Sequence, residues 1–256
     1  MPRCFNDIPL FAKSLVFALC ASLVTACGSD RPRENVLTTD GVDTATDTIK
    51  IMDFTTPLSL DPIAPGWYHR KFKRHGPMDI SFVVRDDKPS IRLATDDTAS
   101  MLFRMVDIPL DDYPLLSWDW LVEQGIDAEF DEMSSSGDDH PARFFLTFQT
   151  PDGKNHHMEI VWGNDQLRAG DWKHLSYYFG LRSFPHFTAN GGSENVGKWF
   201  HEQVDMKSLY TELWGEAGGV RLTELALFCD TDETNASSIA YFHNCLLYTS
   251  PSPRDS

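Results

Sequence analysis

The sequence predicts an all-β protein, an antiparallel β-sandwich with one short helix. Runs rich in β-branched and aromatic residues, such as "DISFVVRD" and "RFFLTFQT", are separated by turn residues at spacings of roughly ten residues, which is typical of sandwiches and not of repeating βαβ folds. The segment "TPDGKN" between two such runs is a strong hairpin signal. The stretch 48–244 is long enough for one such domain with a sizeable core.

The expected strands follow one another with turn residues between them. They are 48–54, 67–72, 79–86, 90–96, 100–108, 115–123, 143–150, 156–163, 174–179, 220–228 and 237–242. One helix near 205–214 interrupts this series, with Asp205 as its cap and Gly215 as its stop. Its apolar residues recur at helical spacing, which predicts core packing along one edge of the sandwich: Met206, Leu209, Tyr210, Leu213 and Trp214.

Alternation along two strands assigns their faces. In 115–123, Trp118 and Trp120 lie on one side and Asp119 on the other, because successive side chains of a strand point in opposite directions. In 143–150, Phe144 is expected in the core and Arg143 opposite it. We therefore expect Asp119 and Arg143 to meet on a shared polar face.

The N-terminal residues have the layout of a secretory signal peptide. Arg3 and Lys13 flank an apolar stretch that is too short for a retained membrane span. Residues 23–27 resemble the bacterial lipoprotein box, which implies cleavage after residue 26 and lipidation of Cys27, so that multiple acyl chains anchor the protein to a membrane. Residues 27–47 are polar and are predicted to be a flexible tether. The expected location is the bacterial cell envelope, with the outer membrane or periplasmic face favoured because Gly28 follows the cysteine.

The C-terminal residues 245–256 resemble the translation of a sequencing adapter, which implies a metagenomic fragment. The β-sandwich domain is thus predicted to span 48–244 and to be truncated at its C-terminal strand.

The formal net charge of -16 argues against nucleic-acid binding, which requires basic surfaces. Of the five cysteines, only Cys229 lies outside the predicted leader, lipidation site and adapter, so no disulfide is expected.

Several segments together resemble the bacterial secreted family known as domain of unknown function 3047, over about 54–244. They include the W-x-W strand at 118–120, "GDDHPAR" at 137–143 and "DTDET" at 230–234. The resemblance implies a jelly-roll sandwich similar to carbohydrate-binding modules and galactose-binding domains. The family usually has Arg between the two tryptophans, where this chain has Asp119.

The doublet Asp138 and Asp139 has two open interpretations. It is either a solvated acidic turn, or a site wall in which Asp139 forms a clamp with Arg143 beside the polar sheet face. Glu159 is expected on that same face. Trp162, close to a strand end, is either core or a platform that stacks a sugar ring.

Asp230, Asp232 and Thr234 occur at alternate positions, which is similar to the opening of an oxygen-rich calcium loop. A structural calcium ion there, with a contribution from Asp53, is one interpretation; an acidic β-turn is the other. The histidines form no zinc motif in the sequence.

The sequence thus favours a lipoprotein whose sandwich binds a carbohydrate or related extracellular ligand through Asp119, Asp138, Asp139, Arg143, Glu159 and Trp162. Two alternatives stay open. One is a glycan hydrolase or lyase that uses carboxylates of the same cleft, and the other is a structural envelope protein without a small ligand.

Overall fold

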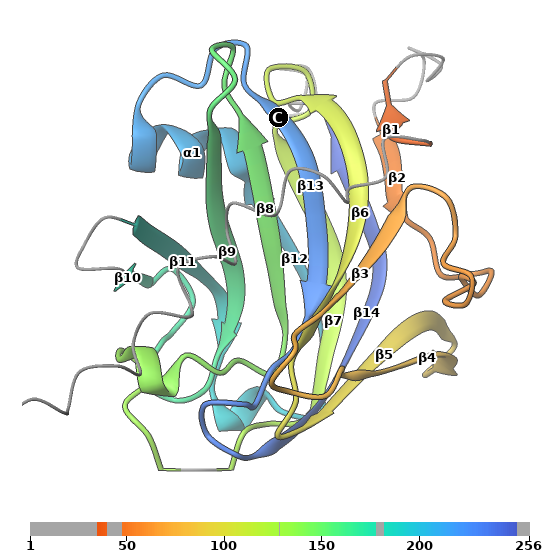
Figure 1. Cartoon of the computed structure of the whole chain (residues 1–256), viewed down its shortest axis with the longest axis vertical. Coiled ribbons are helices and arrows are strands. Elements are labelled where there is room, and N and C mark those ends of the chain that lie inside the picture. Colours follow the sequence, from red (N-terminus) through yellow and green to blue (C-terminus); the bar gives the residue numbers. More distant parts are fainter. Residues whose placement is uncertain (1–34, 40–47, 128, 178–181, 250–256) are drawn as a thin grey trace, which may run out of the picture. The chain divides into compact units, whose positions relative to one another are not determined.

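The computed structural model describes residues 35–39, 48–127, 129–177 and 182–249. These residues form two β-sheets packed face to face with one α-helix (Figure 1), which confirms the predicted sandwich. In this part of the chain, none of the helical segments has the length and apolar character needed to cross a membrane. Cys27 and the predicted leader lie outside the described residues.

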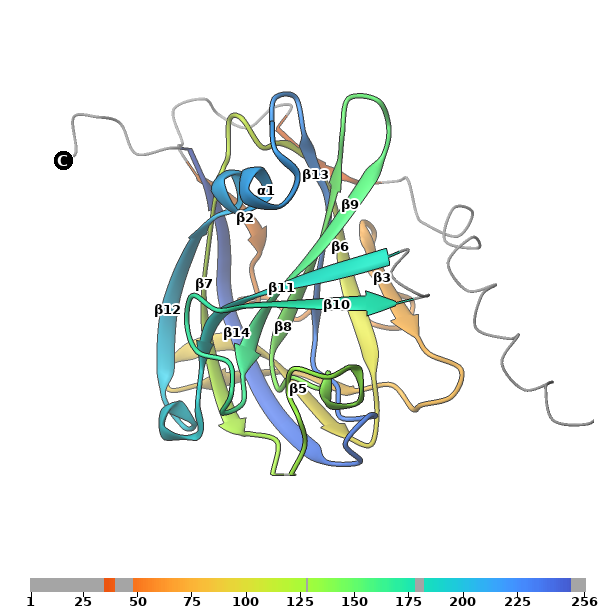
Figure 2. The same cartoon turned by 90° about the vertical axis from the view of Figure 1, so that its left-hand side faces the viewer.

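The larger sheet has eight strands in the order β1-β6-β13-β8-β9-β11-β10, with β3 paired to β6. Its strands are β1 (Leu37–Thr38), β3 (Trp67–Lys71), β6 (Ser100–Pro109), β8 (Arg143–Gln149), β9 (Asn155–Gly163), β10 (Trp172–Tyr177), β11 (Arg182–Gly191) and β13 (Arg221–Phe228). Figure 2 shows β10 and β11 side by side at one edge of this sheet.

The smaller sheet has six strands in the order β12-β7-β14-β5-β4, with β2 paired to β14. Its strands are β2 (Thr48–Met52), β4 (Asp79–Arg85), β5 (Lys88–Asp96), β7 (Leu115–Gln124), β12 (Trp199–Asp205) and β14 (Ser237–Tyr248). The β4–β5 turn uses Asp86 and Asp87 with φ of 49° and 61°, the positive values that a tight hairpin turn requires.

Three strands were not predicted. β1 falls within the predicted tether, and β11 and β12 fall between the predicted strand at 174–179 and the predicted helix. Two pairings are parallel, β1 with β6 and β9 with β11, in an otherwise antiparallel structure. β14 continues past Asn244, where the strand was expected to stop, and Cys245 and Leu247 are buried between β2 and β7.

The predicted helix is confirmed as α1 (Met206–Trp214). It begins where the Asp205 side chain accepts a hydrogen bond from the Ser208 N–H at 2.9 Å, which satisfies one of the free donors of the first turn. It ends at Gly215, whose φ of 85° ordinary residues rarely adopt. Tyr210 is buried and its ring centroid lies 5.4 Å from that of Phe148 on β8, so the helix covers one end of the core.

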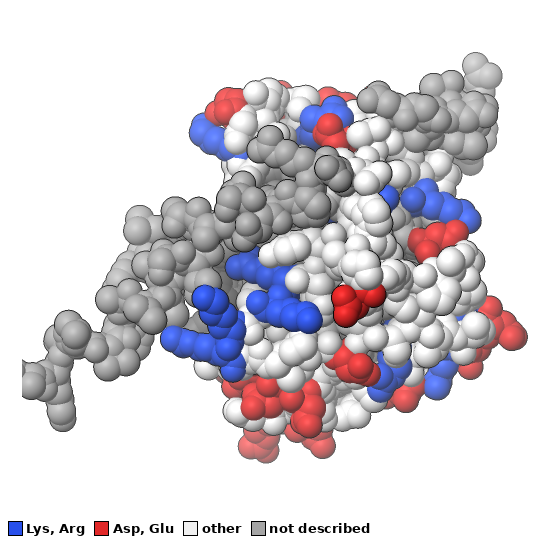
Figure 3. Space-filling model, turned by 45° about the vertical axis from the view of Figure 1, so that its right-hand side comes forward, with Lys and Arg blue, Asp and Glu red and all other residues white. Residues whose placement is uncertain are grey.

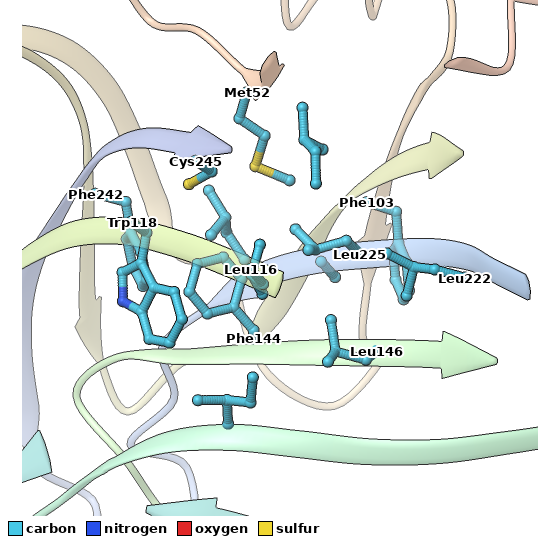
Figure 4. Packing of buried hydrophobic residues seen from close by; sticks show 14 of the residues in the cluster. Met52, Phe103, Leu116, Trp118, Phe144, Leu146, Leu222, Leu225, Phe242 and Cys245 are labelled. Carbon is cyan, nitrogen blue, oxygen red and sulfur yellow. The ribbon is translucent and has the colours of Figure 1, made fainter. Parts of the chain in front are cut away.

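The core lies between the two sheets and follows the predicted alternation (Figure 4). Trp118 and Trp120 of β7 are fully buried, and the Trp118 ring packs edge to face on Phe144 of β8 with centroids 4.9 Å apart. Burial of large apolar side chains is the main stabilising contribution in such a domain. Side chains at the intervening positions of β7 and β8 must therefore point outward, on opposite sides of the sandwich.

Candidate functional site

The acidic doublet lies in the loop between β7 and β8, next to the short 3-10 helix η2 (Ser135–Gly137), and it is not a solvated turn. Asp139 is fully buried and its carboxylate accepts hydrogen bonds from the Thr234 N–H at 2.7 Å and the Thr234 hydroxyl at 2.6 Å. The Glu233 N–H donates to the same carboxylate at 3.3 Å. Asp139 thus ties this loop to the β13–β14 loop. The predicted clamp between Asp139 and Arg143 is wrong, because the oxygens of Asp139 are directed at residues 233–234.

Arg143, the first residue of β8, is the centre of a buried ion cluster. Its Nε donates to Asp230 Oδ1 at 3.0 Å, its Nη2 contacts the other oxygen of Asp230, and its Nη1 donates to Glu159 Oε2 at 2.8 Å. Burial lowers the pKa of Arg143, but the charges of Asp230, Glu159 and Asp138 outweigh burial and hold it well above its ordinary value. The guanidinium is 4.5 Å from the ring centroid of Phe228, and that ring closes one side of it.

Asp138 is surrounded by positively charged or basic groups. Lys173 Nζ donates to Asp138 Oδ1 at 2.8 Å, and the Nε2 atoms of His186 and His140 lie 3.4 and 3.8 Å from the same oxygen. Burial raises the pKa of Asp138, but Arg143, the two histidines and Lys173 together hold it well below its usual range. Asp138 is therefore ionised in the folded protein.

The two histidines of the cluster are orientated by backbone carbonyls. His140 Nδ1 lies 3.0 Å from the Trp162 carbonyl oxygen, and His186 Nδ1 lies 2.8 Å from the Phe184 carbonyl oxygen. Because a carbonyl only accepts, each Nδ1 must carry the proton, and this assigns the tautomer. Burial, together with Arg143, lowers the pKa of His140 well below its ordinary value, so this histidine is neutral and its Nε2 presents a lone pair.

His186 has a different environment from His140. Its Nε2 lies 3.2 Å from Glu159 Oε2 as well as 3.4 Å from Asp138 Oδ1. His186 therefore lies between the two carboxylates of the cluster. Burial raises the pKa of Glu159, but His186 and Arg143 outweigh burial and keep that pKa below its ordinary value.

The cluster is the end of a row of side chains that crosses the outer face of the larger sheet. Directly paired residues of neighbouring strands share a face, and the register therefore places one row on this face from β3 to β10: Tyr68, Phe103, Ala226, Phe145, Glu159, His186 and Lys173. Ring centroids are 5.9 Å apart between Tyr68 and Phe103 and 6.1 Å apart between Phe103 and Phe145. We call this set the outer row; it is aromatic at one end and charged at the other.

Asp119 does not belong to this surface, which corrects the sequence prediction. It points outward from β7 in the smaller sheet, where Lys88 Nζ contacts its Oδ2 at 2.6 Å and His201 Nδ1 contacts its Oδ1 at 2.7 Å. Since Arg143 points outward from the larger sheet, the core separates Asp119 from Arg143. Alternation identifies the side of a strand but not the sheet to which the strand belongs.

Trp162 is core and not a stacking platform, which also corrects a prediction. It is 1 % exposed, and its ring centroid lies 5.4 Å from that of Trp120 and 5.7 Å from that of Phe200. Met158, Ile160 and Trp162 alternate inward along β9, which places Glu159 outward as predicted.

The predicted calcium ligands lie beside the cluster. Asp139, Asp230, Asp232 and Glu233 offer carboxylate oxygens within 4.8 Å of one another, whereas the Thr234 hydroxyl donates to Asp139. Asp53 is not in this group. Burial and, to a smaller extent, the hydrogen bond with Asp139 raise the pKa of Glu233 to about 10. Two carboxyl groups here therefore share either a proton or a cation. The donor set fits calcium, and the calcium site stays a prediction.

Four residues of this region were missed by sequence reasoning. Lys173 and His186 are brought to Asp138 by the pairing of β10 with β11 and of β11 with β9, and His140 lies within the acidic segment itself. Glu132 accepts hydrogen bonds from the backbone N–H groups of residues 164, 166 and 167 at 2.6 to 3.1 Å and so orders the loop after β9. A buried charged residue in a loop produces no periodic pattern in the sequence. Only its contacts in the folded structure identify it.

The family profile described as a protein of unknown function, DUF3047, matches residues 65–245. The chain belongs to the DUF3047 family. The match includes the outer row and the ion cluster, so these features lie within the family domain.

No curated protein sequence matches this DUF3047 chain. Among solved structures, the family 11 carbohydrate-binding module of a cellulosomal cellulase of Clostridium thermocellum has 11% identity and a TM-score of 0.40, over 79% of this chain and 95% of that one. The family 30 module of another cellulosomal cellulase of this organism has 8% identity and a TM-score of 0.42, over 80% and 99%. A xyloglucanase domain of Sinorhizobium fredii, solved with cellobiose, has 13% identity and a TM-score of 0.42, over 72% and 92%.

Proposed function

We propose that the protein binds a carbohydrate on the outer face of the larger sheet. The observation that carries this proposal is the outer row, in which half-buried aromatic rings continue directly into hydrogen-bonding groups. Tyr68 and Phe145 are partly exposed on the face where Glu159 and His186 follow. Sugar rings have apolar faces that stack on aromatic rings and hydroxyl groups that need fixed polar partners.

The charged end of the row is suited to recognition because it is rigid. Arg143 is held by Asp230 and Glu159, and Glu159 is held by Arg143 and His186. A ligand that meets such a surface does not need to order it, which lowers the entropic cost of binding. The same rigidity is consistent with a purely structural role, so binding itself must be measured.

The test is affinity electrophoresis in gels that contain hydroxyethylcellulose, xylan, galactomannan or soluble α-glucan. We expect at least one polysaccharide to retard the protein and Tyr68→Ala and Phe145→Ala to remove the retardation. Trp199→Ala is the matched control, because Trp199 is a partly exposed aromatic on the outer face of the smaller sheet. The proposal would be refuted if none of the polysaccharides retarded the protein. It would also be refuted if Trp199→Ala reduced retardation as much as Tyr68→Ala and Phe145→Ala do.

A second candidate function is a glycan hydrolase or lyase, and one observation favours it. Asp138 and Glu159 both approach His186 Nε2, so two carboxylates and an imidazole lie together beside the aromatic rings. Carboxylate pairs and histidines perform general acid and base catalysis on glycosidic bonds. A hydrolase would release reducing ends, and a lyase would release products that absorb at the wavelength of unsaturated uronates. Either activity would establish the enzyme if Glu159→Gln abolished it. Retardation by a polysaccharide without product release would indicate a binding protein and not an enzyme.

The proposed setting is the bacterial cell envelope, with Cys27 as the lipid attachment site. This rests on the leader and the lipoprotein box alone. We expect the protein to incorporate labelled palmitate during expression in a bacterial host, and we expect Cys27→Ser to abolish this incorporation. Unchanged labelling of that variant would contradict it.

A further inference from the structure

We infer that the outer row selects neutral or amino sugars and rejects glycans that carry carboxylate or sulfate groups. This deepens the proposed function and rests on it. The inference begins with a difference in exposure at the charged end of the row. The side chains of Lys173, Arg143 and His186 are 0 to 2 % exposed, whereas those of Asp138 and Glu159 are 11 % and 9 % exposed. The basic groups therefore lie beneath the surface, and the carboxylates are slightly more exposed.

Glu159 provides one of these acceptors. Its Oε2 is occupied by Arg143 and His186. Among the described residues, none donates a hydrogen bond to the other oxygen, Oε1. Glu159 is paired in register with Phe145, so this acceptor lies next to the last aromatic ring of the row. A sugar stacked on Phe145 would bring a substituent within reach of Oε1, where a hydroxyl or an ammonium group is attracted and an anion is repelled.

His140 adds an unpartnered polar atom next to Asp138. Its side chain is fully buried, and its Nε2 has no hydrogen-bond partner within the described structure. This atom lies 3.8 Å from Asp138 Oδ1. Buried polar atoms in native proteins are normally satisfied, so an unpartnered one is a reason to expect a donor from outside the chain.

The charge of the whole chain acts in the same direction. Its formal net charge is -16, so long-range electrostatics oppose the approach of a polyanion. Figure 3 shows that basic side chains do gather in one group on one face, but acidic groups lie next to them. Selectivity must therefore come from the local acceptors and not from a basic surface.

The test compares three hexasaccharides by isothermal titration calorimetry at pH 6 with the full chain. Cellohexaose is neutral, hexaglucosamine carries an ammonium group on each ring, and hexagalacturonate carries a carboxylate on each ring. We expect the first two to bind, hexaglucosamine about tenfold more tightly, because charge-assisted hydrogen bonds are roughly twice as strong as neutral ones. Hexagalacturonate should not bind. Glu159→Gln should weaken both, hexaglucosamine by more, and so remove the preference for hexaglucosamine.

The outcomes separate the two proposals. Tighter binding of hexagalacturonate than of cellohexaose would overturn the selectivity while the proposed function stands. Failure of all three to bind, together with no retardation by the polysaccharides above, would refute both. A folding defect of Glu159→Gln does not decide the matter, because the wild type offers a second readout. Its affinity for hexaglucosamine should decrease as the NaCl concentration rises from 50 to 500 mM, since salt screens charge interactions. Its affinity for cellohexaose should stay constant over the same range. A salt-independent preference would contradict the inference.

Discussion

The outer faces of the two sheets carry similar kinds of charged residues in opposite environments. On the larger sheet, Arg143 is 2 % exposed and contacts three acidic residues. On the smaller sheet, Lys88 is 35 % exposed; it contacts Asp119 at 2.6 Å and lies 5.5 Å from the ring centroid of Trp199. Attraction in a desolvated site is strong and an unpaired charge there is costly, whereas solvent screens an exposed pair. The comparison indicates that, among the described residues, Arg143 on the larger sheet is held far more firmly than Lys88 on the smaller sheet.

The largest expected effect follows from removing the central cation. Arg143→Met would leave Asp230, Glu159 and Asp138 without their main partner, and we expect a loss of about 3–5 kcal/mol in the free energy of unfolding. Lys88→Met is the matched control on the smaller sheet and should cost about 0–1 kcal/mol. Denaturant unfolding monitored by tryptophan fluorescence measures both. Equal costs for the two variants would remove the distinction between the faces.

The next effect concerns pH. The pKa of His140 is lowered in the folded protein, so the unfolded chain binds the proton more tightly and stability is lost as the pH falls below about 6.5. Unfolding measured at pH 5, 6 and 7 should show decreasing stability toward pH 5, and His140→Gln should reduce this slope. Asp138 adds a loss at lower pH, because its folded pKa is depressed and its contribution disappears as the carboxylate becomes protonated. A slope that is unchanged in His140→Gln would contradict the assignment of a neutral His140.

The acidic group beside the cluster should respond in the opposite direction. The pKa of Glu233 is raised to about 10, so the folded state binds its proton more tightly and stability from this group decreases as the pH rises from about 4.5 to about 10. Glu233→Gln should be more stable than the wild type at pH 8 and similar to it at pH 4. If calcium binds there, millimolar calcium should raise the unfolding midpoint of the wild type at pH 8 and chelation should reverse the rise. If the unfolding midpoint did not change with calcium, the carboxyl groups would share a proton and not a cation.

The smallest effect is expected on the smaller sheet. His201 is 62 % exposed and Asp119 is only partly buried, so Asp119→Asn should change the unfolding free energy by less than about 1 kcal/mol. It should leave polysaccharide retardation unchanged. A loss of retardation in this variant would move the binding face to the smaller sheet and restore the role first predicted for Asp119.

Much of the fold follows from the sequence because alternation and turn residues are local signals. Trp118 and Trp120 are buried as the strand pattern predicts, and α1 begins at Asp205 and ends before Gly215 as its caps predict. Alternation also placed Arg143 correctly on the outside of its sheet. The same pattern applied to β9 would have placed Trp162 in the core, with Met158 and Ile160.

The site was only partly predictable because it depends on strand order. Glu159 and His186 become neighbours only through the parallel pairing of β9 with β11, and that pairing leaves no local trace in either strand. Asp119 and Arg143 were combined wrongly for the same reason, since a strand's periodicity does not identify its sheet. Asp138 and Asp139 were identified, but their partners were not, because those partners come from distant loops and strands.

The most direct test of the binding face is a titration of isotopically labelled protein with cellohexaose, followed by backbone amide chemical shifts. The account predicts that the perturbed amides cluster on β3, β6, β8, β9 and β11, around Tyr68, Phe145 and Glu159. Perturbations confined to β7, β12 and β14, or none at saturating ligand, would contradict it.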